Sequence, residues 1–291
     1  ESDWLASALA ERGAEGADVY ADALTANLAS GTARILFPTD GMRIAMTYKS
    51  LGSPKFVSYL GDSVFYCTEL GKRGVGDFAW ALIAAEHCGT SFPSDAANTP
   101  ESLLQSIAEA ELESGGFALT GNTADADTTA IVLRALAPYR ESCSELVERT
   151  LNALAELQRE SGAFASLGTE TAESTAQVVL ALSALGIAPD SDERFVKNGV
   201  ACIDALYGFA TSDGFAHIRG GETDALATAQ ALSALRAYEL PQQNDDSVPA
   251  SAGAVPSLSS AATDNDSGTT QTVLLVAAAV AVVAGAAVFL R

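Results

Sequence analysis

The sequence predicts an all-α protein, in which a repeated pair of helices forms the body and one apolar helix follows a polar stretch. Three observations carry this prediction. Similar segments recur at spacings of 46 and 53 residues within the first 240 residues. Ser, Ala, Thr, Asn, Asp and Pro then dominate residues 241–271, and residues 272–290 contain no charge over 19 positions.

The repeat consists of a turn containing Ser and Phe, a polar loop, and an apolar run that begins with Thr. The turns lie at 114–117, 161–164 and 212–215, and the runs begin at Thr129, Thr175 and Thr228. Each run has Ala and Leu at the same two positions, and the spacing is that of helix-pair repeats. Because the runs are apolar almost all round, they predict helices that are buried on every side.

Amphipathic segments separate the apolar runs. In residues 144–159, Val147, Leu151 and Leu154 form one apolar stripe, while acidic and amide side chains face away. We expect buried inner helices at 2–9, 40–51 and 77–87 and in the runs from Thr129, Thr175 and Thr228, and outer helices at 18–29, 100–112 and 144–159. Six inner helices with five or six outer ones would close into an α–α toroid, which we assign to residues 1–240.

The two segments behind the toroid predict where the protein is located. Residues 241–271 hold too few large apolar side chains to fold and predict a disordered stalk. Residues 272–290 would span about 28 Å as a helix, close to the thickness of a bilayer, and predict a transmembrane helix. The chain starts at Glu1 rather than Met, as expected of a mature exported protein after loss of a signal peptide, or of a fragment. We therefore expect a single-pass protein of the cell membrane with its N-terminal domain outside the cell.

The charge and the metal-ligating residues exclude several functions. A net charge of −21 argues against nucleic-acid partners and against attachment to a membrane through a basic patch. Four cysteines without a CxxC pair and two histidines predict no zinc site, and no metal or cofactor is expected. The cysteines fit buried free thiols better than disulfides, although export would leave three pairings open. They are Cys67, Cys88, Cys143 and Cys202.

The turn at residues 158–164, QRESGAF, resembles the QxxxGxW turn of the prenyltransferase and squalene-cyclase repeat family, with Phe164 in place of Trp. The segments around Trp4 and Trp80 are similar to toroid proteins of bacterial surfaces, and vertebrate cobalamin carriers share the toroid. The resemblance covers about residues 2–240. It implies an α–α toroid whose inner helices all run in the same direction.

Carboxylates stand at the start of nearly every inner helix, so the implied direction would gather them around one opening, which we call the acidic mouth. They are Asp3, Asp40, Asp77, Asp125, Asp127, Glu170, Glu173, Glu222 and Asp224. One interpretation is helix capping, which requires no ligand. The other is a ring that binds a cationic or hydroxyl-rich ligand, or a metal such as calcium. The residues predicted to bind a ligand are Asp125, Asp127, Glu173 and Asp224, with Trp4 and Trp80 as stacking surfaces.

Residues 125–130, DADTTA, resemble the DxDDTA motif of class II terpene cyclases. In those enzymes the middle Asp protonates an alkene or an epoxide, so the resemblance implies a general acid at Asp127. A carboxyl group kept neutral in a dry cavity suits that chemistry. However, Thr128 stands where the motif has Asp, and residues 241–291 cannot supply the second helical domain of those cyclases.

The leading hypothesis is therefore a non-catalytic surface toroid that binds a small ligand at the acidic mouth. The resemblance to cobalamin carriers makes a corrinoid the first ligand to test. One alternative is a cyclase-like enzyme, an isomerase, that uses Asp127. The other is an adhesive or structural module that binds surface proteins through its outer helices. The prenyltransferase zinc ligands and the complement-type thioester motif are both absent from the sequence.

Overall fold

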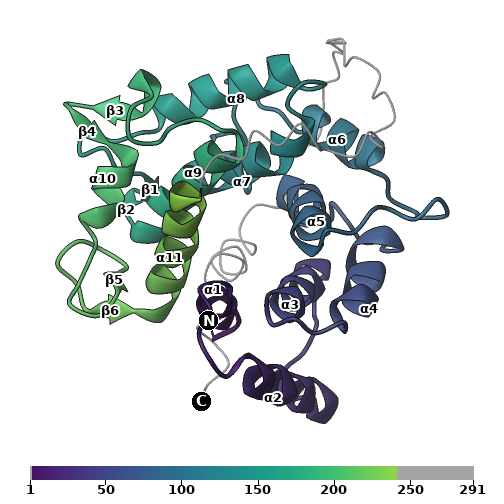
Figure 1. Cartoon of the computed structure of the whole chain (residues 1–291). Coiled ribbons are helices and arrows are strands. Elements are labelled where there is room, and N and C mark those ends of the chain that lie inside the picture. Colours follow the sequence, from purple (N-terminus) through teal and green to yellow (C-terminus); the bar gives the residue numbers. More distant parts are fainter. Residues whose placement is uncertain (1, 241–291) are drawn as a thin grey trace.

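The computed structural model describes residues 2–240, within which eleven α-helices alternate between an inner ring and an outer layer (Figure 1). The inner helices are α1 (Ser2–Glu11), α3 (Pro38–Ser50), α5 (Val75–Cys88), α7 (Ala126–Leu136), α9 (Ala172–Ala184) and α11 (Ala225–Glu239). Each inner helix packs against the next, and α11 packs back against α1, so the ring closes. The predicted α–α toroid is confirmed.

The outer layer contains three helices that the sequence predicts and two that it does not. The layer consists of α2 (Ala17–Ser30), α4 (Phe56–Leu60), α6 (Pro100–Glu109), α8 (Ser144–Glu156) and α10 (Cys202–Tyr207). A π-helical turn, η1 (Gly61–Phe65), extends α4, and two 3₁₀ turns are η2 (Ala137–Tyr139) and η3 (Glu193–Phe195). Helices α4 and α10 are only 5 and 6 residues long, too short to display a helical period.

The helical toroid fits the predicted all-α class, and the structure adds three short hairpins that join some of the helices. They are β1 (Ala165–Ser166) with β2 (Thr169–Glu170), β3 (Val196–Lys197) with β4 (Val200–Ala201), and β5 (Phe215–Ala216) with β6 (Thr223–Asp224). All three pairs are antiparallel. Strands of two residues are too short to show an alternating pattern, so sequence periodicity does not predict them.

The core lies between the two layers. Every residue of α9 from Ala172 to Ser183 is buried, as predicted for an inner helix. Helix α8 buries one stripe that includes Leu146, Leu151 and Leu154. The four cysteines are buried and free, which agrees with the preferred interpretation.

A threonine–phenylalanine contact explains the sequence repeat. The Phe117 N–H donates to Thr129 Oγ1 at 3.1 Å, and the Thr129 hydroxyl donates back to the Phe117 carbonyl at 3.1 Å. Thr228 makes the same two hydrogen bonds with Phe215, at 2.9 and 3.3 Å. In the middle repeat the Phe164 N–H donates to Thr175 Oγ1 at 3.1 Å. Each Thr thus fixes the preceding turn to the start of an inner helix.

Neighbouring inner helices run in the same direction. Near their N-termini, Ser174 of α9 donates to Asp127 of α7 at 3.1 Å. Near their C-termini, the Ser50 hydroxyl of α3 donates to Glu11 of α1 at 2.7 Å and lies 3.0 Å from His87 Nε2 of α5. One end of the ring therefore collects the N-terminal turns, and the opposite end collects the C-terminal turns.

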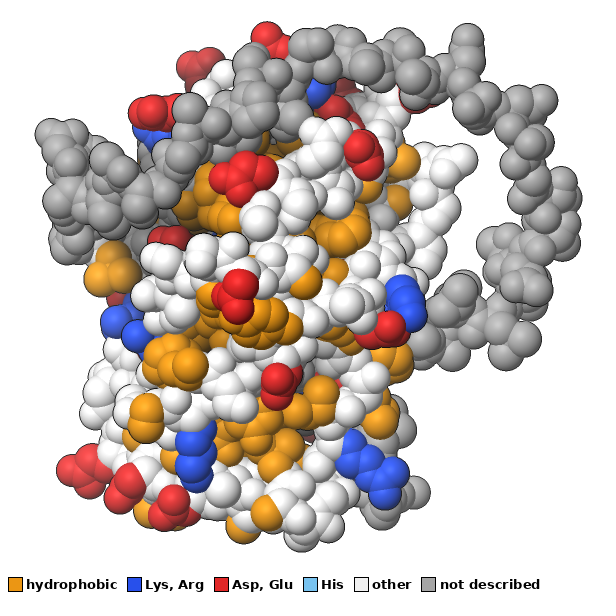
Figure 2. Space-filling view, turned by 90° about the vertical axis from the view of Figure 1, so that its right-hand side faces the viewer, with side chains coloured by type: hydrophobic (Ala, Val, Ile, Leu, Met, Phe, Trp, Pro, Cys, Tyr) orange, Lys and Arg blue, Asp and Glu red, His pale blue; other side chains and the backbone are white. Residues whose placement is uncertain are grey.

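The segments for which the sequence predicts a stalk and a transmembrane helix, 241–271 and 272–290, lie outside the described residues. Among the helices of residues 2–240, none combines the length and the apolar character needed to cross a membrane. Figure 2 shows Lys and Arg in small separate groups on one face of the molecule, with acidic and apolar side chains between them. That face offers no continuous basic patch to an anionic surface.

Candidate functional site

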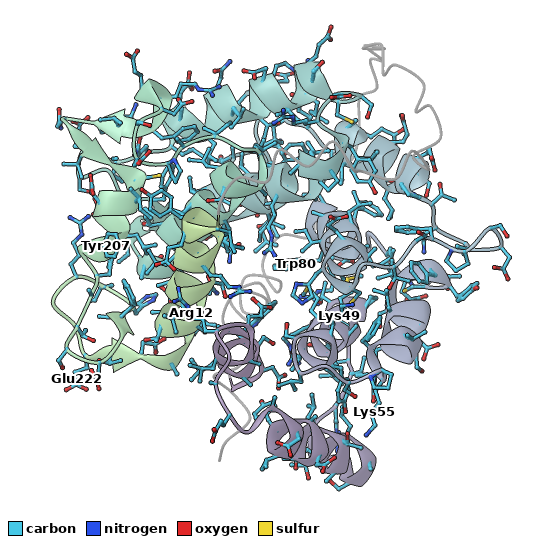
Figure 3. All side chains as sticks on the ribbon, in the orientation of Figure 1. Arg12, Lys49, Lys55, Trp80, Tyr207 and Glu222 are labelled. Atoms are coloured by element: carbon cyan, nitrogen blue, oxygen red, sulfur yellow. The ribbon has the colours of Figure 1, made fainter. Side chains whose placement is uncertain are left out.

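A central cavity of about 210 Å³ lies inside the ring, and all six inner helices line it. The lining residues are Trp4, Ser7, Glu11, Met46, Ser50, Trp80, His87, Ile131, Arg134, Gln177, Leu180, Ala229, Gln230, Ser233, Arg236, Ala237 and Leu240. In Figure 3 Trp80 lies toward the centre of the ring, whereas Glu222 and Lys55 lie at its periphery. The cavity is thus an interior feature that the closed ring creates.

Two aromatic side chains form part of the apolar wall of the cavity. The rings of Trp4 and Trp80 are tilted by 43°, with their centroids 5.7 Å apart. Met46, Ile131 and Leu180 add aliphatic surface to the same cavity. The chain contains only 2 Trp, so both of its tryptophans are in the cavity wall.

Two amide side chains face each other across the junction of α9 and α11. Gln177 Nε2 donates to Gln230 Oε1 at 3.0 Å. Gln177 is only 8% exposed, and its Oε1 has no hydrogen-bond partner among residues 2–240. A buried acceptor without a donor is costly, and Gln177 lines the cavity, so a ligand donor that reached this amide would relieve the cost.

Glu11 organises the C-terminal end of the cavity. Its carboxylate accepts from Ser50 and lies 3.7 Å from Arg236 Nε and 3.8 Å from His87 Nε2. Burial lowers the pKa of His87, the charge of Glu11 raises it, and the charges of Arg134 and Lys49 lower it further. The lowered pKa makes His87 neutral at pH 7, so the Glu11 carboxylate is balanced by Arg236.

Arg134 is the second guanidinium of the cavity. Its Cζ atom lies 6.0 Å from the centroid of the Trp80 ring, within the range of a cation–π interaction. No side chain of residues 2–240 accepts a hydrogen bond from Arg134 or forms an ion pair with it within 4.0 Å. Burial lowers the pKa of Arg134, while the charge of Glu11 raises it. The guanidinium nevertheless stays charged, because the pKa of Arg lies far above neutral pH.

Two carboxylates of the acidic mouth cap their helices. Asp125 accepts from the N–H groups of Thr128 at 2.7 Å and Leu119 at 2.8 Å. Asp224 accepts from the N–H groups of Leu226 at 2.8 Å and Ala227 at 2.9 Å. Both side chains therefore perform the capping role that requires no ligand.

The other two carboxylates of the acidic mouth are buried. Asp127 Oδ2 accepts from Ser174, whereas Oδ1 has no partner among the described residues. The pKa of Asp127 is raised to about 7, mainly by burial and also by the charges of Asp125 and Glu173, while the nearby hydroxyl groups of Ser174 and Ser166 oppose the shift. Glu173 lies 3.0 Å from His217 Nδ1, and burial raises its pKa.

The structure thus separates the six predicted ligand-binding residues into two groups. Trp4 and Trp80 line the cavity. The four carboxylates lie at the N-terminal end of the ring, and none of them lines the cavity. They are Asp125, Asp127, Glu173 and Asp224. Within residues 2–240 no group of three or more His, Cys, Asp or Glu side chains is placed to hold a metal ion.

Sequence reasoning missed the polar residues of the cavity. Arg134, Gln177 and Gln230 each interrupt one of the three apolar runs that define the repeat. A polar side chain within a helix that is buried on every side must face a partner, water or a ligand. That interruption was the signal that could have revealed the cavity.

A closed ring of parallel inner helices around a cavity of ligand size defines the α–α toroid class. The chain belongs to the prenyltransferase α–α toroid domain family, whose sequence model matches residues 72–253, more than half of the 291 residues. The match begins just before α5, so the ring extends on the N-terminal side through α1 and α3. No curated protein sequence matches the chain.

Proposed function

We propose that this protein is a non-catalytic binding protein that holds a small ligand in its central cavity and is presented at the cell surface. The cavity carries this proposal, because it combines a pair of tryptophans with Arg134, which forms no ion pair, and Gln177, whose Oε1 has no hydrogen-bond partner, among residues 2–240. An apolar cavity of about 150 Å³ is enough to bind benzene. The cavity of about 210 Å³ therefore suits a ligand with one ring and a polar substituent.

The proposal moves the ligand from the acidic mouth to the cavity. Asp125 and Asp224 already accept hydrogen bonds from backbone N–H groups, so their carboxylates do not need a ligand to satisfy them. A corrinoid is far larger than the cavity and would have to lie outside it, over the mouth. Small compounds are therefore the first ligands to test.

The surface location rests on residues 272–290, whose 19 uncharged positions suit a membrane span. Fractionation of the producing cells should recover the full chain with membranes, and protease added to intact cells should remove residues 1–240. A chain without residues 272–290 should leave the membrane fraction. Recovery of the full chain without membranes would contradict this part of the proposal.

Intrinsic fluorescence tests the binding function directly, because both tryptophans line the cavity. Titration of the full chain with phenol and benzamide should change the emission until it saturates. Ala229, which is 1% exposed, lines the cavity, so Ala229→Leu should fill the space and weaken the response. Ala14→Leu, at an exposed position, is the matched control. Absence of a saturable change with any small aromatic probe would reject the proposal.

One observation favours a cyclase-like enzyme as the second candidate, since a pKa of about 7 keeps Asp127 protonated at mildly acidic pH. The absence of Asp127 from the cavity lining argues against it. Incubation of the protein with polyprenes at mildly acidic pH tests this function, with Asp127→Asn as the control. A cyclised product that the variant fails to form would establish the enzyme, and absence of any product would exclude this chemistry.

A further inference from the structure

The charges of the cavity point to one chemical class of ligand. Arg236 and Glu11 lie 3.7 Å apart and balance each other, and His87 is neutral at pH 7 because burial lowers its pKa. Arg134 has no ion-pair partner within 4.0 Å among residues 2–240, in a protein whose net charge is −21. Arg134 is half-buried, so its charge is poorly solvated, and an anion that enters the cavity interacts with it more strongly than it would in water.

The number of charges limits the anion to a single negative charge. One guanidinium is uncompensated, and Glu11 would repel a ligand that carried two charges. A guanidinium presents parallel N–H donors that match the two oxygens of a carboxylate. A carboxylate therefore fits Arg134 better than a phosphate dianion does.

The tryptophans determine the body of the ligand. Arg134 lies over the Trp80 ring, and Trp4 lies 5.7 Å from Trp80. An anion held at Arg134 thus leaves the rest of the ligand beside two indole rings. Aromatic rings pair favourably in tilted or offset geometry. The volume of about 210 Å³ allows one ring, since about 150 Å³ suffices for benzene.

The amide pair adds a hydrogen bond to this description. Gln177 lines the same cavity as Arg134, and its Oε1 is a buried acceptor without a donor among residues 2–240. Because Oε1 has almost no accessible surface, the amide has to turn toward the cavity before a hydroxyl group on the ligand can donate to it. Resting on the binding function proposed above, we propose that the cavity binds a small aromatic monocarboxylate that carries a hydroxyl group, with Arg134 on the carboxylate and Gln177 on the hydroxyl.

Two matched probes test the anion without altering the protein. 4-Hydroxybenzoate and 4-hydroxybenzamide differ in charge and share the ring and the hydroxyl group. Titration of the full chain, followed by tryptophan fluorescence and calorimetry at pH 7, should give at least tenfold tighter binding of the acid. Benzoate, which lacks the hydroxyl group, should bind more weakly than 4-hydroxybenzoate. Equal affinity for the acid and the amide would overturn the assignment of Arg134.

Variants of Arg134 locate the effect. Arg134→Gln should lower the affinity for the acid at least tenfold and leave the affinity for the amide unchanged. Arg134→Lys should retain part of the affinity for the acid. The Tm of the free Arg134→Gln variant should change little, because Arg134 is half-buried and forms no ion pair or hydrogen bond among residues 2–240. Equal weakening of acid and amide would assign Arg134 a structural role instead.

The outcomes separate this inference from the binding function on which it rests. If phenol and the amide bind and the acid is not preferred, the cavity remains a binding site, but the inference that its ligand is an anion is overturned. Tighter binding of inorganic phosphate than of benzoate would overturn the inference that the anionic group of the ligand is a carboxylate. A failure of every aromatic probe to bind would overturn both.

Discussion

Asp127 illustrates how burial controls a single residue. Its side chain is 5% exposed near the start of α7, and one carboxylate oxygen has no hydrogen-bond partner among residues 2–240. Burial and the charge of Asp125 raise its pKa from 3.8 to about 7. The folded protein therefore holds a proton that the unfolded chain releases at a lower pH.

We expect this proton to make stability depend on pH. Between about pH 4 and pH 7 the folded state binds more protons at Asp127, so the free energy of unfolding falls as pH rises, by on the order of a few kcal/mol. Asn lacks this proton, and its oxygen can still accept from Ser174. Urea unfolding of wild type and Asp127→Asn should therefore give a difference that increasingly favours the variant from pH 4 to pH 7. Parallel curves would contradict the raised pKa.

The threonines of the repeat permit a second test at the residue scale. Thr175 is 0% exposed and accepts from the Phe164 N–H. Thr175→Val keeps the shape and leaves that N–H without a partner, which should lower the free energy of unfolding by about 1–3 kcal/mol. Thr175→Ser keeps the hydroxyl group and should cost less. Denaturant unfolding measures both variants, and an equal loss would show that the methyl group, not the hydrogen bond, matters.

The residues of the candidate site were predictable only in part. Trp4 and Trp80 attract attention in any sequence because large aromatic side chains dominate binding surfaces. Arg134 and Gln177 lie inside apolar runs, and only the closed ring reveals that they face a shared cavity. The sequence could not distinguish capping carboxylates from ligand-binding ones, because both functions use the same residue type at the same position.

At the scale of the element, the turn before β1 and the β1–β2 hairpin each need a glycine, but for different reasons. Gly162 has φ +80°, and a Cβ atom there would lie 2.9 Å from the Val200 carbonyl oxygen. Gly168, in the β1–β2 hairpin, has φ +88° and open space around it. The pair thus separates the strain of a left-handed backbone from a steric clash.

Gly162→Ala should therefore destabilise the protein more than Gly168→Ala. The strain alone should cost on the order of 1 kcal/mol at Gly168, and the clash with the β4 backbone should add to that cost at Gly162. Thermal and denaturant unfolding of both variants measure the difference. Equal destabilisation would mean that β4 moves aside without cost.

The long elements were predictable because burial on every side leaves a clear pattern. Inner helices such as α9 are apolar around their whole circumference, and α8 shows one regular stripe. The hairpins and α10 were not predictable, because segments of two to six residues are shorter than the periods by which sequences are recognised. Tertiary contacts decide their conformation.

At the scale of the whole molecule, the ring closes where the first inner helix meets the last. Arg12 donates to the Leu232 carbonyl at 3.3 Å and lies 3.4 Å from Glu239, and Trp4 of α1 reaches the cavity. Within residues 2–240 the chain connects α1 to α11 only through the other helices, so non-covalent contacts alone close this junction. In Figure 3 Arg12 lies beside α11, close to this junction.

Removal of residues 1–16 should therefore open the cavity to water. Trp80 would lose its aromatic neighbour and gain contact with solvent, so its emission should shift to the red and unfolding should become less cooperative. Full-length Trp4→Phe, which retains only Trp80, is the matched control and should keep a blue-shifted emission. An unchanged spectrum in the truncated chain would mean that five inner helices close the ring by themselves.

Because the junction of α1 and α11 is sealed by packing, the order of the helices around the ring does not depend on where the chain starts. A circular permutant could join residue 240 to residue 2 and begin instead in the exposed connection between α5 and α6. The new connection would have to run back along α11, about 22 Å for 15 helical residues, as the outer segments do elsewhere. The cavity is a property of the closed circle, and the chain termini only mark one of several places where that circle can be cut.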